Sequence, residues 1–167
     1  AFHGLMENGQ IDGETYGIPF QRSTIVLFWN KDAFEAAGLD PEVPPENWQE
    51  MAEMAVAVRE ATNGEQWGVM VPSTGYAYWM FQAFAFQNGH RLMNEAGTEV
   101  YFDDPAAIEA LEYWVALAQE HQAMPEGIIE WGTLRQNFLE ESTAMMWHTT
   151  GTLSAVRSEA RFDFGVA

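Results

Sequence analysis

The segment YGIPFQRSTIVLFWNKD, residues 16–32, places a polar cluster directly before an almost unbroken apolar run. The apolar run, Ile25 to Trp29, has the continuous hydrophobicity of a strand that is buried on both faces. Arg22, Ser23 and Thr24 stand immediately before it. A core strand does not ordinarily begin with a guanidinium and two hydroxyl groups, because such groups favour water. The segment therefore predicts a strand whose first end meets a polar site.

The rest of the chain alternates predicted helices with predicted strands. Asp32 is a good N-cap for a short helix, Asn47 caps a longer one, and Pro105 stands at the first position of a third. We expect helices at 33–37, 48–62, 75–87, 105–123, 133–140 and 153–160, strands at 66–71, 143–148 and 162–167, and an irregular hairpin at 90–102. In the helix that begins at Pro105 the predicted apolar face is Ile108, Leu111, Val115 and Ala118, with Trp114 alongside. The alternation indicates an α/β layer fold.

Composition excludes several classes of partner. The 167 residues suit one domain or one lobe of a larger fold, and the 47% hydrophobic content is enough for a core. The net charge is −18, from 25 acidic and 7 basic residues, which argues against nucleic acid and against an anionic membrane surface. The acidic residues either keep the protein soluble or reflect a salt-loving source, and we favour some salt adaptation. There is no cysteine, so no disulfide forms.

The sequence offers no catalytic machinery, metal motif or cofactor motif. The four histidines are scattered, and none has a second ligand at helical or turn spacing. Glycine-rich phosphate loops and the G-x-S-x-G elbow are absent from the sequence. Glu140 and Glu141 are adjacent, so they cannot face each other across a substrate. We therefore expect a binding protein, without a metal or cofactor, in preference to an enzyme.

Three polar or aromatic clusters at strand ends are candidate ligand contacts, because ligands of open α/β sheets bind outside the carboxyl ends of the strands. The first is Arg22, Ser23 and Thr24. It lies at the start of its strand, so it fits this rule less well than the other two. The alternative is an ordinary loop rich in turn hydroxyls.

The second cluster is Tyr76, Tyr78 and Trp79, which follows the strand GVMV. Exposed aromatic rings near a helix start suit stacking on a sugar face or a cation, and the alternative is packing in the core. The third cluster is HTTGT, residues 148–152, in which Thr149 and Thr150 offer hydroxyl groups and Gly151 allows close backbone approach. Its alternative is simple N-capping by Thr150.

Several segments together resemble one known family. The stretch from YGIPFQRSTIVLFWNKD through AFEAAGLDP and PPENWQEM is similar to the family-1 extracellular solute-binding proteins of carbohydrate ABC importers. FDDPAAIEALEYWVAL and the C-terminal FLEESTAMMWHTTGTLSAVRSEARFDFGVA match the same family. The likeness is strongest to the members that bind glycerol 3-phosphate. Arg22 and His148 depart from that pattern, since those members have small residues there.

The resemblance implies a type II periplasmic-binding-protein-like fold, in which two α/β lobes close on a solute. It implies that residues 1–24 end lobe one and that residues 25–167 form lobe two, so the chain is an interior fragment. By alignment it makes Arg22, Ser23, Thr24, Tyr76, Trp79, Thr149, Thr150 and Gly151 the ligand contacts. The implied partners are a sugar or glycerophosphate-type solute and an ABC permease, with a monomeric protein outside the cytoplasm, either periplasmic or anchored as a lipoprotein.

Three alternatives stay open at this point. The first is an oligosaccharide binder that recognises no phosphate. The second is a carbohydrate-active enzyme, which would need two carboxylates placed across its cleft. The third is an interaction module whose aromatic side chains form a protein interface.

Overall fold

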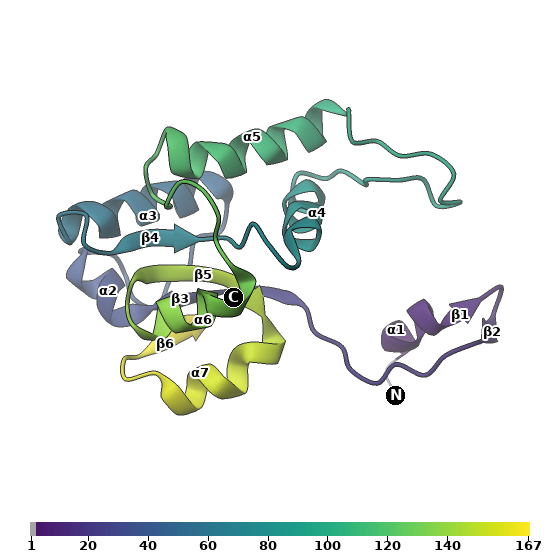
Figure 1. The fold of residues 1–167 in the computed structure, drawn as a ribbon, viewed down its shortest axis with the longest axis horizontal. Helices are drawn as coiled ribbons and strands as arrows, with labels where there is room; N and C mark the ends of the chain where they lie inside the picture. The colour runs from purple at the N-terminus through teal and green to yellow at the C-terminus, as the bar shows by residue number, and fades with distance from the viewer. Residues whose placement is uncertain (1–2) are drawn as a thin grey trace.

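The computed structural model describes residues 3–167, which form an arm and an α/β body. The arm, residues 3–24, projects from the body (Figure 1). It contains α1 (His3–Met6), the 3₁₀ turn η1 (Glu7–Gly9) and a hairpin of β1 (Gln10–Ile11) with β2 (Glu14–Thr15). The hairpin turns at Asp12 and Gly13, whose positive φ angles of 51° and 82° are those that a two-residue Asp-Gly turn favours.

The body is built on a four-stranded sheet in the order β4-β5-β3-β6. The strands are β3 (Ile25–Asn30), β4 (Trp67–Met70), β5 (Thr143–Thr149) and β6 (Phe164–Val166). β4 and β5 are parallel, whereas β3 is antiparallel to both of its neighbours, with Ile25 opposite Thr149. Because of this reversal, the start of β3 lies beside the carboxyl end of β5, at the same end of the sheet.

Helices cover both faces of the sheet (Figure 1). The helices of the body are α2 (Lys31–Ala36), α3 (Trp48–Ala61), α4 (Ala77–Gln87), α5 (Pro105–Gln119), α6 (Trp131–Leu139) and α7 (Leu153–Glu159), and all but α5 lie next to the sheet. Successive residues of β5 show the two layers. Trp147 packs on Phe84 of α4, with ring centroids 4.2 Å apart, and the next residue, His148, packs on Trp131 of α6. α5 lies outside this arrangement and packs against α4.

Helix N-termini follow the sequence in part. Asn47 caps α3 as predicted, since its side chain accepts the Glu50 N–H at 2.9 Å. The predicted cap of α2 at Asp32 is wrong, because the helix begins earlier and Asn30 accepts the Ala33 N–H.

Two hydroxyl residues, Ser73 and Thr74, precede α4 and would suit N-capping, but neither caps it. The helix begins after Tyr76 without a side-chain cap. The Ser73 Oγ instead accepts the Ile129 N–H, and the Thr74 Oγ1 accepts the Trp131 N–H. Both hydroxyls therefore tie the loop before α4 to the segment before α6.

The predicted apolar face of α5 is wrong at three of its positions, although Ala118 and the adjacent Trp114 pack against the core as expected. Ile108, Leu111 and Val115 are between 44% and 50% exposed. The fully buried positions of the helix are instead Ala107, Ala110 and Leu117. Because α5 is apolar on most of its surface, periodicity alone did not identify the packed side.

The prediction that β3 is buried on both faces holds for half of the strand. Phe28, Trp29 and Asn30 are buried, whereas Ile25, Val26 and Leu27 are half-buried. The half-buried end is the one that meets the polar cluster, and a cavity adjoins it.

Candidate functional site

The first and third predicted clusters meet at the end of the sheet where β3 begins and β5 ends. The Thr150 N–H donates to the Thr24 carbonyl oxygen at 3.0 Å, and the Thr24 N–H donates to Thr150 Oγ1 at 3.3 Å. Antiparallel pairing of β3 with β5 produces this contact, which resolves the apparent misfit of a cluster at a strand's start. Thr150 uses its oxygen as an acceptor, so its hydroxyl proton is available to a ligand. N-capping by Thr150 is not observed, because α7 follows a 3₁₀ turn, η2 (Thr150–Thr152), and has no side-chain cap.

The other members of these two clusters lie close by. A Cβ atom added at Gly151 would lie 3.3 Å from Thr149 Oγ1 and 4.0 Å from Ser23 Cβ. Thr149 is buried, Ser23 is half-buried and Gly151 is exposed. A side chain at Gly151 would therefore crowd the Thr149 hydroxyl, and glycine keeps the space beside it and Ser23 open.

Arg22 lies on the arm side of this end of the sheet. Its side chain is exposed, and its Nη2 donates to the Leu5 carbonyl oxygen at 3.3 Å. The guanidinium has several further N–H donors, which suit an anionic or hydroxylated ligand.

The second cluster forms an aromatic group at the start of α4. Tyr76 and Tyr78 are 45% and 69% exposed, so packing in the core, the alternative for these two residues, is wrong. Trp79 is half-buried, with its ring centroid 6.3 Å from that of Tyr76 in an edge-to-face contact. The exposed rings provide flat apolar surface beside the polar end of the sheet.

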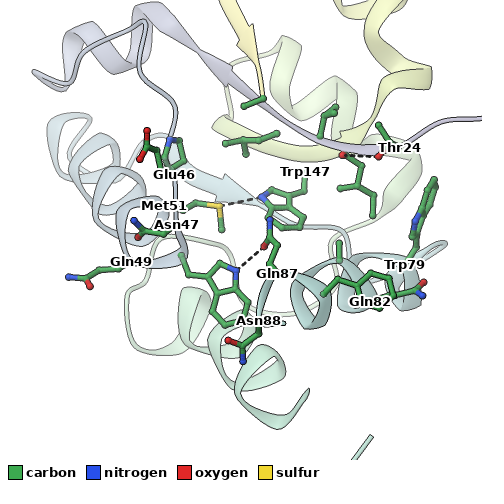
Figure 2. Close-up of a pocket in the computed structure, with 18 residues that line it drawn as sticks. Thr24, Glu46, Asn47, Gln49, Met51, Trp79, Gln82, Gln87, Asn88 and Trp147 are labelled. Atoms are coloured by element: carbon green, nitrogen blue, oxygen red, sulfur yellow. Dashed lines mark hydrogen bonds between the residues drawn. The ribbon is translucent and has the colours of Figure 1, made fainter. Parts of the chain in front are cut away.

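A cavity of about 1030 Å³ opens between α3, α4 and the half-buried end of β3 (Figure 2). Two of the eight predicted contacts, Thr24 and Trp79, line it. Its polar lining also includes amide side chains that the sequence did not single out: Asn47, Gln49, Gln82, Gln87 and Asn88. Glu46 is the one charged residue among those that line it in the described part of the chain.

Tryptophan side chains shape the wall of this cavity. Trp48 Nε1 donates to Gln87 Oε1 at 2.8 Å, and Trp147 Nε1 contacts Met51 Sδ at 3.2 Å (Figure 2). The sequence showed Trp48 only as part of a helix face and Trp147 only as part of a strand. The sequence could not show that these tryptophan and amide side chains line one cavity, because they come together only in the folded structure.

His148 is a buried imidazole directly below this end of the sheet. Its Nδ1 accepts the Thr149 N–H at 2.9 Å, which requires an unprotonated Nδ1. The pKa of His148 is lowered from 6.5 to about 4, chiefly because burial disfavours the charged ring; a hydrogen bond with the Trp131 backbone opposes the shift, and the positive charge of Arg135 adds to it. The ring is therefore neutral near pH 7.

The described residues contain no group of three or more His, Asp or Glu side chains arranged to hold a metal ion. Within the same residues, no helix combines the length and the apolar character that spanning a bilayer requires.

A mixed sheet with one reversed strand and helices on both faces is the architecture of the type II periplasmic binding proteins, and this chain covers part of that fold. Solved members have the same fold. The Thermotoga lettingae TMO ABC transporter solute-binding protein, bound with alpha-D-tagatose, matches 99% of this chain with a TM-score of 0.87 and 23% identity, over 44% of its own length. UgpB from Mycobacterium tuberculosis, in complex with glycerophosphocholine, gives a TM-score of 0.86 at 23% identity, over 99% of this chain and 40% of that one.

Residues 2–167 match the family described as bacterial extracellular solute-binding protein, and the chain belongs to that family. Among curated relatives, the sn-glycerol-3-phosphate-binding periplasmic protein UgpB of Escherichia coli (strain K12) is 32% identical over 164 residues. Its counterpart in Salmonella typhimurium (strain LT2) is 30% identical over 158 residues. Each alignment covers 92% of this chain and 35% of the relative, so the chain spans about a third of their length. The predicted family and fold class are confirmed.

Proposed function

We propose that the chain is part of the substrate-binding component of an ABC importer that carries a sugar or a glycerol-3-phosphate-like solute. The observation that carries this proposal is the pairing of Thr24 with Thr150 across β3 and β5, beside the aromatic group at Tyr76 and Trp79. Hydroxyl groups and backbone N–H groups would bind the solute's oxygens, and the aromatic faces would cover its C–H surfaces. Family membership and the named relatives support this reading.

In this proposal residues 25–167 are lobe two, and residues 1–24 are the end of lobe one and the approach to the hinge. The arm's separation from the body in Figure 1 supports that boundary. The solute would lie between this lobe and the other one, and binding would close the two lobes by a hinge motion. The protein would act outside the cytoplasm as a monomer, deliver its solute to a permease and need no cofactor.

Two solute chemistries are compatible with these residues. Arg22 would suit a phosphate, because a guanidinium forms bidentate, charge-assisted hydrogen bonds with it. A sugar without phosphate is the second candidate. It is favoured by the cavity, whose lining in the described residues has amide and aromatic side chains but no lysine or arginine. Arg22→Ala separates the two, since it weakens phosphate binding strongly and sugar binding little.

We further propose that the protein catalyses no reaction on its solute. Glycoside cleavage needs two carboxylates that flank the bond. Of the described residues that line the cavity, Glu46 alone is acidic. Turnover of a bound sugar, detected by chromatography after incubation, would overturn this part of the proposal.

A thermal-shift screen of the full-length protein tests the proposal. The panel contains sn-glycerol 3-phosphate, glycerophosphocholine, tagatose and maltose. A solute that binds only the native state raises the melting temperature, by an amount that grows with the ratio of its concentration to Kd. We expect at least one member to do so, and a flat response to every member up to millimolar concentration would contradict the proposed solute class.

A further inference from the structure

Trp131, the first residue of α6, lies between the two groups of proposed ligand contacts. Its ring centroid is 4.9 Å from that of Tyr76, in an edge-to-face arrangement. On another side it is 4.2 Å from the ring centroid of His148. One half-buried side chain therefore touches both the aromatic group of α4 and the strand that leads to Thr150.

Hydrogen bonds join the backbone around Trp131 to the loop before α4. The Trp131 N–H donates to Thr74 Oγ1 at 3.3 Å, and the Thr74 hydroxyl donates to Glu130 Oε2 at 2.7 Å. Gly75 has a φ of +70°, and a Cβ atom added there would lie 2.9 Å from Trp131 Cβ. The loop and the start of α6 are thus packed as closely as a glycine permits.

His148 continues this connection to the hydroxyl turn. The side chain is 7% exposed, so it lies below the surface that a solute would touch. Its Nδ1 accepts the Thr149 N–H, which fixes the backbone immediately before Thr150. Thr150 in turn exchanges hydrogen bonds with Thr24.

We propose that His148 and Trp131 are positioning residues, which hold the aromatic group at Tyr76 and the hydroxyl turn at Thr150 at a fixed separation before the solute arrives. This inference rests on the proposed function. Its basis is the continuous series of ring contacts and hydrogen bonds that runs from Tyr76 through Trp131 and His148 to Thr149. A site whose contacts are fixed in advance binds more tightly, because less freedom is lost on binding.

Substitution of His148 tests this inference in the full-length protein, since a buried residue cannot contact the solute directly. The solute is the panel member that raises the melting temperature most, and Kd is measured by calorimetry. We expect His148→Ala to raise Kd by about tenfold, because it removes both the ring contact and the hydrogen-bond acceptor. His148→Phe keeps a ring against Trp131 and should lose less affinity.

A double-mutant cycle distinguishes positioning from general destabilisation. Tyr76→Ala and His148→Ala should together raise Kd by less than the product of their separate effects, because each removes the benefit of the same fixed separation. Trp67→Ala is the matched control. Trp67 is another half-buried tryptophan, stacked with Arg59 at the far end of β4, and its loss should lower the melting temperature without changing Kd.

The possible outcomes separate the two proposals. If the wild-type protein binds no solute of the panel, the proposed function fails and the inference fails with it. If the wild type binds and His148→Ala binds equally well, only the inference fails. If His148→Ala does not fold, His148→Asn takes its place, because it keeps a hydrogen-bond acceptor and lacks the ring. Unchanged affinity in His148→Asn would overturn the role of the ring contact.

Discussion

Burial of His148 should make the stability of the fold depend on pH in a defined window. The pKa of His148 is lowered from 6.5 to about 4, chiefly because burial disfavours the charged ring. Between these two values the unfolded chain binds a proton that the folded chain does not. The contribution of neutral His148 to the free energy of unfolding is therefore fully present above pH 6.5 and is lost as pH falls toward 4.

The size of this effect follows from the shift. One pKa unit corresponds to about 1.4 kcal/mol, so the difference for His148 amounts to about 3 kcal/mol across the window. Other groups titrate over the same range, and their contribution cancels when the wild type is compared with a variant that lacks the imidazole. His148→Phe and His148→Asn are two such variants, and they should give the same pH slope.

Urea unfolding followed by tryptophan fluorescence, at intervals from pH 7.5 to pH 4, measures the free energy of unfolding of each protein. We expect the free energy of unfolding of the wild type to fall by about 3 kcal/mol relative to that of either variant as pH falls from 7.5 to 4. Parallel curves for wild type and variants would refute the reasoning, because they would show that His148 takes up its proton equally well in the folded state.

Three further predictions concern stability. Gly75→Ala should lower the free energy of unfolding by more than Gly38→Ala. Both glycines have positive φ, which costs an alanine about 1 kcal/mol. Of the two positions, the new Cβ contacts another atom at Gly75, where Trp131 Cβ lies 2.9 Å away. Equal losses in urea unfolding would show that the Gly75 contact is not tight. Gly68→Ala should prevent folding, since its Cβ would overlap the Ala55 carbonyl oxygen of the neighbouring helix. A soluble variant with native circular dichroism would contradict this packing of β4 on α3. Raising the salt concentration from about 0.1 M to 1 M should raise the melting temperature, because the net charge of −18 is self-repulsive and the screening length falls from about 10 Å to about 3 Å; a melting temperature that falls or stays constant would argue against salt adaptation.

The α/β class and most elements could be predicted from the sequence, because these depend on local patterns, and the family was indicated by the resemblance of whole segments. The continuous run Ile25 to Trp29, the cap at Asn47 and the proline at the start of α5 each have a local physical cause. Where two local signals compete, the sequence was less informative. Asn30 and Asp32 are both good caps, and the Asn30 side chain forms the capping hydrogen bond because the helix begins at Lys31.

The site was predictable in its parts and not in its assembly. Thr24 and Thr150 were visible as members of separate clusters 126 positions apart, and only the antiparallel register of β3 with β5 shows that the Thr24 backbone is hydrogen-bonded to Thr150. The roles of Trp131 and His148 depend on ring contacts between α6 and β5, which no spacing in the sequence encodes. The exposed side of α5 was similarly beyond prediction, because the helix is apolar on most of its surface.

Calorimetric titration of the full-length protein, with Trp79→Ala and Thr150→Ala as variants, tests the central claim most directly. The claim is that the solute is held where β3 begins and β5 ends, together with the start of α4. We predict that each substitution weakens binding at least tenfold while urea unfolding shows the fold intact. Wild-type affinity in both variants, measured with a solute that the protein demonstrably binds, would contradict the claim.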